Sequence, residues 1–258
     1  MDNAGQAVEF GPYAILPSMS QAADLSAETR AQFAACSSAT LSTQLFKRGL
    51  RNQVMQGVSR LTPGAPPLVG PAFTLRNIPA REDIDHVGIH QDPSHPQRRA
   101  IEVTPPGAVL VIDCRGDARC ASAGGILIRR LAVRGVAGLV SDGGLRDTPE
   151  IAAQPFPVYC KGPAAPISLT HQHAVDFDVP IACGGVAVYP GDVIVGDAEA
   201  VIVVPRHLAA EVAADAFAQE DLETFVLQEI ASGRPLPGTY PPDEATRARY
   251  EAWRKKAK

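Results

Sequence analysis

Short apolar runs alternate with turn residues in the middle of this chain, and their order predicts an α/β fold. Residues 108–113 (AVLVID) and 138–141 (GLVS) are short, apolar and rich in β-branched side chains, as buried strands are. Residues 123–134, between them, begin with small side chains and fit a helix. A strand, a helix and a strand at this spacing predict a βαβ unit with two parallel strands.

The pattern before this unit predicts mainly helices. We expect residues 1–20 to form an irregular arm, and residues 21–50 to hold two helices that begin at Ser26 and near Ala39. A turn rich in proline and glycine follows, and residues 68–75 (LVGPAFTL) are typical of a strand.

The second half of the chain is predicted to be rich in short strands before it ends in helices. The expected strands are 157–160, 180–183, 186–188, 193–195 and 200–204. A long amphipathic helix is expected over 208–232, followed by a short charged helix around Trp253. We therefore predict a compact β core with flanking helices. Residues 1–205 would form the main domain, and residues 206–258 a helical extension packed on the core or on a neighbouring subunit.

A polar segment at residues 76–99 interrupts this pattern and carries three of the six histidines. We predict a long loop, and loops of that length are often functional. His86 and His90 would share a face if the segment were helical, and they could then bind a metal with His95 nearby. Glycine and proline residues argue against a helix, so a solvated loop or a substrate contact is the alternative. The role of residues 81–99 stays open.

Composition and charge exclude several classes of protein. The chain has 258 residues, is 45% hydrophobic and carries a net charge of −4, so it has no basic field for nucleic acid or a membrane surface. Apolar stretches such as Ala132–Val140 are too short for a membrane span. We see no signal peptide and expect a cytoplasmic protein. Five scattered cysteines without a C-x-x-C pair predict reduced thiols rather than a zinc site.

Two glycines open the helix of the βαβ unit, and they are the first part of the candidate site. The first turn of a helix presents unpaired backbone N–H groups and a positive dipole end, and glycine lets a ligand approach closely. Gly124, Gly125, Ile126 and Leu127 are therefore candidates to bind a carboxylate or a phosphate. Close packing is the alternative explanation for the glycine pair.

A glycine-rich turn after the next strand presents Arg146 and Asp147 side by side. The arginine fork suits carbonyl and enolate oxygens, and a carboxylate suits Mg²⁺ or Mn²⁺. Both ends of the unit lie at the carboxyl edge of the strands, where open α/β sheets usually bind ligands. Together they could hold a small 2-oxo acid. A surface ion pair is the alternative.

Four further acidic and basic residues follow the two strands of the unit. Those after the first strand could contact substrate or a metal-bound water, and structural pairing is the alternative: Asp113, Arg115 and Asp117. Asp142 precedes the glycine-rich turn, and we expect it to cap that turn.

These motifs resemble the 4-hydroxy-4-methyl-2-oxoglutarate / 4-carboxy-4-hydroxy-2-oxoadipate aldolase (RraA-like) family. The signature of that family looks like a glycine, twenty residues, Arg-Asp, two residues and an acid, which matches Gly125, Arg146-Asp147 and Glu150 here. Similar segments extend the resemblance over about residues 35–205: Ala39–Ser42, Val69–Thr74, Pro106–Val111, Gly185-Val186 and Tyr189–Asp192.

The resemblance implies a class II pyruvate aldolase with the swivelling β/β/α fold, assembled as a homotrimer or a hexamer. It implies that Asp147 binds Mg²⁺ or Mn²⁺, that Arg146 contacts the keto oxygen and the developing enolate, and that Glu150 supports them. The amides of Gly124–Leu127 would bind the pyruvyl carboxylate. Cleavage of a small 2-oxo acid and oxaloacetate decarboxylation share this enolate, so both reactions are expected.

One position departs from the family. Many members have Gly-Glu or Gly-Asp at the helix start, where this chain has Gly124-Gly125. The acid that would assist proton transfer there is missing, so aldol cleavage of the usual substrates is an open question. Two other functions stay open. Some family members are regulators that bind a ribonuclease, but such members look metal-free and lack the Asp after the Arg. A hydratase of a sugar-derived 2-oxo acid would use the same enolate.

Overall fold

A computed structural model describes residues 25–257, so the arm expected over residues 1–20 lies outside the described part. The centre of the fold is an eight-stranded sheet in the order β1-β7-β5-β3-β2-β12-β13, with β9 paired to the second half of β2. Its four central strands are parallel: β2 (Leu68–Pro79), β3 (Val109–Asp113), β5 (Gly138–Ser141) and β7 (Val158–Cys160). The flanking strands are antiparallel: β1 (Ser59–Arg60), β9 (Gln172–Phe177), β12 (Val193–Gly196) and β13 (Val201–Val204).

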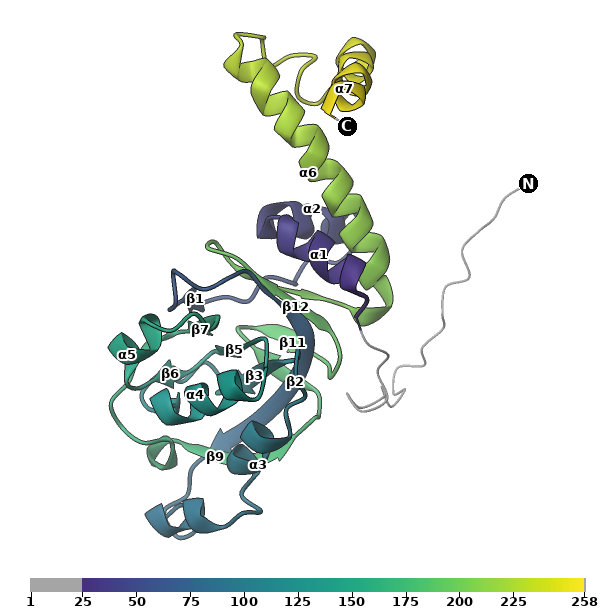
Figure 1. Ribbon diagram of the computed structural model, residues 1–258. Coiled ribbons are helices and arrows are strands. Elements are labelled where there is room, and N and C mark those ends of the chain that lie inside the picture. Colours follow the sequence, from purple (N-terminus) through teal and green to yellow (C-terminus); the bar gives the residue numbers. More distant parts are fainter. Residues whose placement is uncertain (1–24, 258) are drawn as a thin grey trace, which may run out of the picture.

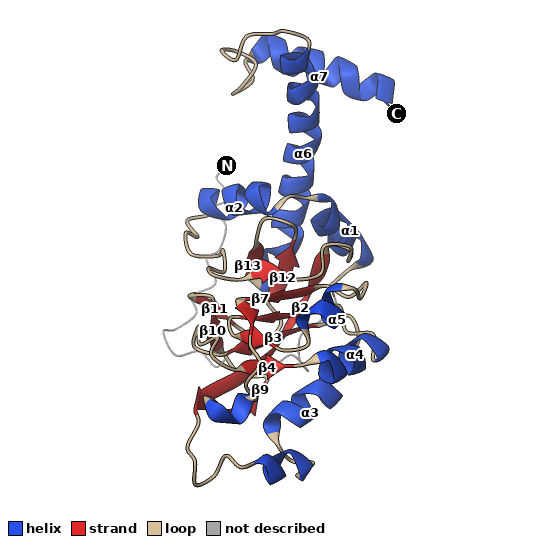
Figure 2. Ribbon diagram, turned by 90° about the vertical axis from the view of Figure 1, so that its left-hand side faces the viewer, coloured by secondary structure: helices blue, strands red, loops and turns tan. Residues whose placement is uncertain are grey.

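The predicted βαβ unit is present, with β3 and β5 parallel and α4 between them in the chain. Three helices cover one face of the sheet: α3 (Pro96–Val103), α4 (Gly125–Val133) and α5 (Thr148–Ala152). The hairpin of β10 (Ile181–Cys183) and β11 (Val186–Val188) covers the other face, as Figure 2 shows. Both faces are therefore apolar, which explains why β3 is buried along its whole length.

Two N-capped helices, α1 (Ala27–Ala35) and α2 (Ser38–Lys47), follow the start of the described chain. The hydroxyl of Ser26 accepts from the amide of Thr29, and that of Ser37 accepts from Thr40, which is why the helices begin where they do. Both helices pack on α6 (Ala209–Ala231).

The long helix α6 belongs to the body of the fold at one end and leaves it at the other. Val212, Ala213 and Ala216 share a core with α1, α2, β12 and β13. Farther along, α6 extends away from the sheet and meets α7 (Glu244–Ala257) at its far end (Figure 1). Phe225 and Trp253 join the two helices, with ring centroids 5.7 Å apart. The domain boundary at residue 205 and packing on a neighbouring subunit stay predictions.

A second, small parallel sheet lies beside the main one and was not predicted. It consists of β4 (Ala121–Ala123), β6 (Gly144–Leu145) and β8 (Gly162–Pro163). Each strand has only two or three residues. They matter because they place the ends of two glycine-rich segments next to each other.

The prediction of one long loop over residues 76–99 was wrong at both ends. Strand β2 continues to Pro79 because β9 pairs with its second half, and Pro96 starts α3 from the first helical position. Between them lies a 3-10 helix, η2 (Val87–Gln91). The described residues also hold the 3-10 turns η3 (Ser168–Thr170) and η4 (Arg206–Leu208).

Two predictions from composition can be compared directly with the structure. All five cysteines are free and buried, as expected for reduced thiols. Between residues 25 and 257, no helix combines the length and the apolar character that crossing a bilayer requires.

Candidate active site

Short parallel strands bring the two glycine-rich segments of the sequence together. In the register of β4 and β6, Ala123 lies opposite Leu145, so the next residues, Gly124 and Arg146, emerge side by side. The amide of Arg146 donates to the carbonyl of Ala123 over 3.2 Å and fixes this arrangement. The twenty-residue spacing seen in the sequence is thus the length of chain needed for α4, β5 and the return turn.

Gly124 leaves room for two side chains that approach its backbone closely. A Cβ atom at this position would lie 2.8 Å from Oδ2 of Asp147 and 2.9 Å from Nε of Arg146. Both distances are too short for real Cβ contacts. The glycine therefore lets the carboxylate and the guanidinium reach the first turn of α4.

Asp147 holds an unusual backbone conformation at the start of α5. Its φ of 60° lies in the left-handed region, which aspartate tolerates better than most side chains do. Its Oδ2 accepts from the amide of Gly125 over 3.0 Å and lies 3.6 Å from Nε of Arg146. Its Oδ1 makes no hydrogen bond to any described residue, and the side chain is half-exposed, so this oxygen can take another ligand.

Glu150 brings a second carboxylate to the same place. From the first turn of α5, its Oε2 lies 3.5 Å from the point where a Cβ of residue 125 would be, and Oδ2 of Asp147 lies 3.7 Å from that point. The two carboxylates therefore flank Gly125. One or two carboxylates, with water completing the shell, are the donor set that Mg²⁺ prefers, so these residues fit the divalent cation that the sequence led us to expect.

The first turn of α4 has one amide fewer for a ligand than the sequence predicted. Gly124 precedes the helix without a side-chain cap, and the amide of Gly125 is taken by Asp147. The amides of Gly124, Ile126 and Leu127 are the others at this terminus, where helical N–H groups have no partner within the helix. The side chain of Ile126 is 82% exposed at this tip.

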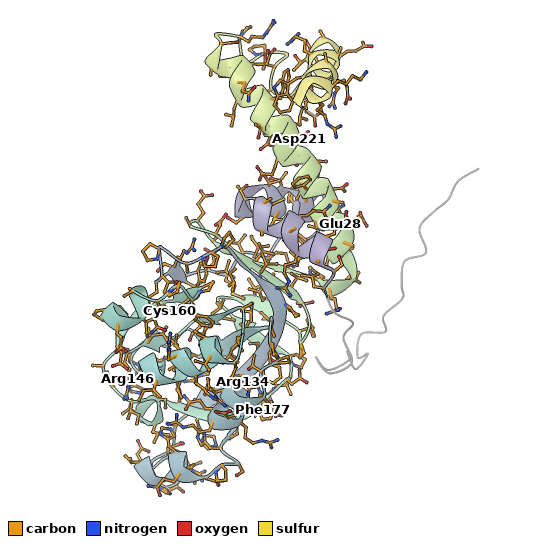
Figure 3. The ribbon with its side chains drawn as sticks, in the orientation of Figure 1. Glu28, Arg134, Arg146, Cys160, Phe177 and Asp221 are labelled. Carbon is orange, nitrogen blue, oxygen red and sulfur yellow. The ribbon has the colours of Figure 1, made fainter. Side chains whose placement is uncertain are left out.

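A pocket of about 120 Å³ adjoins the helix tip. A water molecule needs roughly 10–15 Å³ on this measure, so the pocket has room for a small organic acid. Arg146, labelled in Figure 3, lines it together with Asp147, Gly124, Ile126 and Leu127. The structure thus brings every candidate substrate-binding residue to one pocket except Gly125, whose amide is covered by Asp147. Glu150 lies beside the pocket without lining it.

Another part of the pocket lining comes from segments whose role the sequence left open. It contains His90, Gln97 and Arg98 from η2 and α3, and Ile167 and Ser168 at η3. The histidine content of residues 76–99 indicated a functional loop and left a substrate contact by His90 open, whereas nothing in the sequence pointed to Gln97, Arg98, Ile167 or Ser168.

Asp142 and the residues after β3 have structural partners. Asp142 is buried, and its carboxylate accepts from the amides of Cys114, Gly116 and Gly184, so it ties three loops together rather than capping its own turn. The expectation of a local cap was wrong, because the carboxylate accepts hydrogen bonds from the amides of other segments instead.

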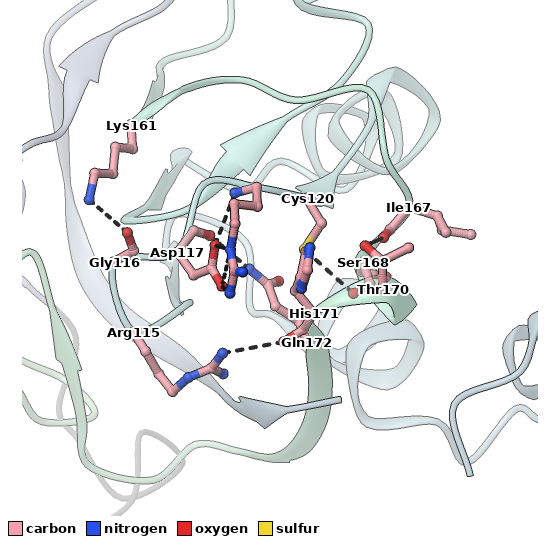
Figure 4. A network of polar contacts seen from close by, with 11 residues as sticks. Arg115, Gly116, Asp117, Cys120, Lys161, Ile167, Ser168, Thr170, His171 and Gln172 are labelled. Carbon is pink, nitrogen blue, oxygen red and sulfur yellow. Dashed lines mark hydrogen bonds and ion pairs between the residues drawn. The ribbon is translucent and has the colours of Figure 1, made fainter. Parts of the chain in front are cut away.

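The segment after β3 forms its own polar network, which Figure 4 shows. Asp117 pairs with Arg119 over 2.7 Å, and this ion pair holds the pKa of Asp117 well below its usual range. Arg115 donates to the carbonyl of His171, and Asp113 accepts from the amide of Arg115. Burial raises the pKa of Asp113. The sequence left open whether these residues contact substrate or form structural pairs, and the contacts seen here are structural pairs.

The histidines of residues 81–99 do not form a metal site of the usual size. Among residues 25–257, no group of three or more His, Cys, Asp or Glu side chains is placed to hold a metal ion. His90 and His95 instead pack edge to face, with ring centroids 5.2 Å apart.

Fold and pocket together define a mixed α/β protein with a candidate small-molecule site at the tip of α4. A family model described as RraA-like, Aldolase/RraA, matches residues 38–203. The chain belongs to the RraA-like family, as the resemblance in its sequence indicated.

Similar proteins span most of the chain. A protein of Halalkalibacterium halodurans named "Putative 4-hydroxy-4-methyl-2-oxoglutarate aldolase" is 34% identical over 162 residues, which cover 60% of this chain and 70% of that protein. A protein of the same name from Burkholderia mallei is 34% identical over 151 residues, 58% of this chain and 83% of that protein. The crystal structure of Streptomyces coelicolor RraAS2, described as an unusual member of the RNase ES inhibitor RraA protein family, superimposes with a TM-score of 0.69 at 30% identity. It covers 82% of this chain and 99% of that one.

The two glycines provide a matched pair of variants that tests the site geometry. We expect Gly124→Ala to fold and to lose its activity on 2-oxo acids, the activity expected from the sequence, on the order of 100-fold. The new methyl group would displace the side chains of Asp147 and Arg146. Gly125→Ala should keep most of the activity, since its nearest contact is 3.5 Å. Steady-state rates and melting temperatures of both variants measure this. Equal rates would show that the close approach at Gly124 is unimportant.

Proposed function

We propose that this protein is a divalent-metal-dependent lyase that acts on small 2-oxo acids, by retro-aldol cleavage to pyruvate or by decarboxylation of an oxaloacetate-type acid. The observation that carries the proposal is that Arg146, Asp147 and the first turn of α4 face one pocket. The names of its relatives support a lyase of the 4-hydroxy-4-methyl-2-oxoglutarate aldolase type. A trimer or hexamer stays part of this proposal.

Binding would start at the helix tip. The amides of Gly124, Ile126 and Leu127 would hold the carboxylate next to the keto group, because unpaired N–H groups and the helix dipole both favour an anion there. Arg146 would then reach the keto oxygen from the adjacent position, and its fork would fix the orientation of the oxygen.

Asp147, supported by Glu150, would hold the cation. A divalent cation bound there would supply Lewis-acid polarisation of the keto oxygen. Cleavage of the bond beyond C3 moves an electron pair into the enolate of pyruvate, and negative charge grows on that oxygen. Arg146 would stabilise this charge more than the neutral carbonyl of the substrate, and such differential stabilisation lowers the barrier. Loss of CO₂ from oxaloacetate produces the same enolate.

Glu150 is our candidate for the acid missing at residue 125. Its Oε2 lies 3.5 Å from the place where a side chain at residue 125 would begin. A carboxylate from α5 would thus serve in place of one at the helix start. Through a water molecule it would accept the proton that the C4 hydroxyl loses as the C3–C4 bond breaks, and it would return that proton to C3 of the enolate to give pyruvate.

The experiment is a measurement of pyruvate release by the purified protein, coupled to lactate dehydrogenase and NADH. We expect release from oxaloacetate or from 4-hydroxy-4-methyl-2-oxoglutarate with Mg²⁺ or Mn²⁺, loss of release with EDTA, and recovery when metal is added in excess. Asp147 and Glu150 favour this outcome over a ribonuclease regulator. Turnover of a sugar-derived 2-oxo acid without pyruvate would instead indicate a hydratase, and no turnover of any acid would refute the lyase.

A further inference from the structure

The segment from η2 to α3 supplies part of the pocket lining beside the helix tip. His90 lies in η2 and Arg98 in α3, and both line the same pocket as Gly124 and Arg146. The segment is fixed rather than loosely placed. Asp85 is buried, accepts from the amide of Arg81 and pairs with Nδ1 of His173 on β9 over 2.7 Å.

Arg98 is a half-buried cation without a partner. No hydrogen bond or ion pair joins its guanidinium to any of the residues 25–257. Burial and the charge of Arg146 both lower the pKa of Arg98, so two guanidinium groups share one pocket and repel each other. The neighbouring Arg99 differs: it is exposed and lies over the ring of Phe177, 5.2 Å from its centroid.

Buried polar atoms around Arg98 also lack partners within the described structure. They are Nε2 of His90, both ring nitrogens of His95 and Oε1 of Gln97. His95 and Gln97 are 5% and 6% exposed, and Gln97 lines the pocket. Buried polar groups are nearly always hydrogen-bonded, so unpaired atoms on three nearby residues beside a pocket indicate a polar ligand. His90 is suited to donate to it as a neutral ring, because burial and the charge of Arg98 lower its pKa to about 4.

We propose that Arg98, helped by Nε2 of His90, binds a second carboxylate of the substrate and is its specificity-determining residue. This inference rests on the proposed function, in which the helix tip holds the first carboxylate. The helix tip and Arg146 account for one acid group and one keto oxygen, and the second cation in the pocket then requires a second anion. In the dicarboxylic acids named under the proposed function, Arg98 would thus hold the carboxylate that lies farther from the keto group, while the helix tip holds the nearer one.

Direct binding tests this without turnover. The probes are 2-oxoglutarate, which has two carboxylates, and 2-oxobutyrate, which has one, each titrated calorimetrically with Mg²⁺ into wild-type protein, Arg98→Gln and Arg99→Gln. We expect wild type to prefer 2-oxoglutarate and Arg98→Gln to bind it roughly 10- to 100-fold more weakly, with binding of 2-oxobutyrate unchanged. Arg99→Gln should behave as wild type, because its side chain does not line the pocket.

Two further variants separate the proposed role from a structural one. Arg98→Lys keeps the charge and should restore part of the preference, and His90→Ala should weaken only the dicarboxylate, and less than Arg98→Gln does. If wild type binds both acids and Arg98→Gln keeps the preference, or loses both acids equally, the second subsite is wrong while the lyase stands. If wild type binds neither acid, the proposed function fails and this inference fails with it.

Discussion

Replacing Asp147 with asparagine or alanine is expected to abolish metal-dependent turnover while the protein stays folded. The side chain is 43% exposed and accepts one backbone hydrogen bond, from Gly125, so its loss costs the fold on the order of 1 kcal/mol. Asn is the sharper variant, because it removes the charge but tolerates the φ of 60° as Asp does. The measurement is the initial rate of pyruvate release over a range of Mg²⁺ concentrations, with a melting curve for each variant.

The matched control is Asp215→Ala. Asp215 is an exposed carboxylate on α6 that pairs with Arg48, far along the chain from the pocket, and surface ion pairs contribute little to stability. Its variant should show the wild-type rate and the wild-type dependence on metal. A full rate for Asp147→Asn in saturating Mg²⁺ would show that this carboxylate is not the metal ligand.

The elements that the sequence predicted well are those with a clear local apolar pattern. Strands β3 and β5 are buried along their whole length and helix α4 buries one side, so residues 108–113, 123–134 and 138–141 carry a strong and local signal. Ser26 could also be read from the sequence alone, because its hydroxyl caps the helix that follows directly.

The small sheet of β4, β6 and β8 could not be predicted, although it assembles the site. Strands of two or three residues carry no period of their own, and their pairing depends on where the larger sheet places their ends. The resemblance in sequence identified Gly125, Arg146, Asp147 and Glu150 without this sheet. What it could not show is that Asp147 binds the amide of Gly125, since that contact depends on a left-handed residue at the start of α5.

His90 and Arg98 illustrate the other limit. Each is a single residue in a polar segment, without a motif, and the prediction of a loop over residues 76–99 left their orientation undefined. Their place in the pocket results from two contacts at a distance: the pairing of β2 with β9, and the hydrogen bond from Gln97 to the carbonyl of Ser122 over 2.7 Å. Only the folded chain shows that this segment lines the same pocket as the tip of α4.

Arg146→Lys is expected to lower kcat and kcat/KM together, on the order of 100- to 1,000-fold. The loss of one preorganised donor to a developing oxyanion has effects of this size, and a lysine ammonium provides a point charge in place of a planar fork. Nε of Arg146 lies beside Gly124 and Asp147, and the single ammonium group of a lysine cannot place a donor at the same position. Steady-state kinetics with oxaloacetate, at saturating Mg²⁺, measures both constants.

The fall in both constants distinguishes a transition-state contact from simple binding. If Arg146 only held the substrate, Arg146→Lys would raise KM and leave kcat unchanged. Arg130→Lys is the matched control, because Arg130 lies on the exposed side of the same helix α4, pairs with Glu102 over 2.7 Å and does not line the pocket. Equal kcat values for Arg146→Lys and Arg130→Lys would show that Arg146 does not act in the chemical step. Stabilisation of the enolate would then depend on the cation alone.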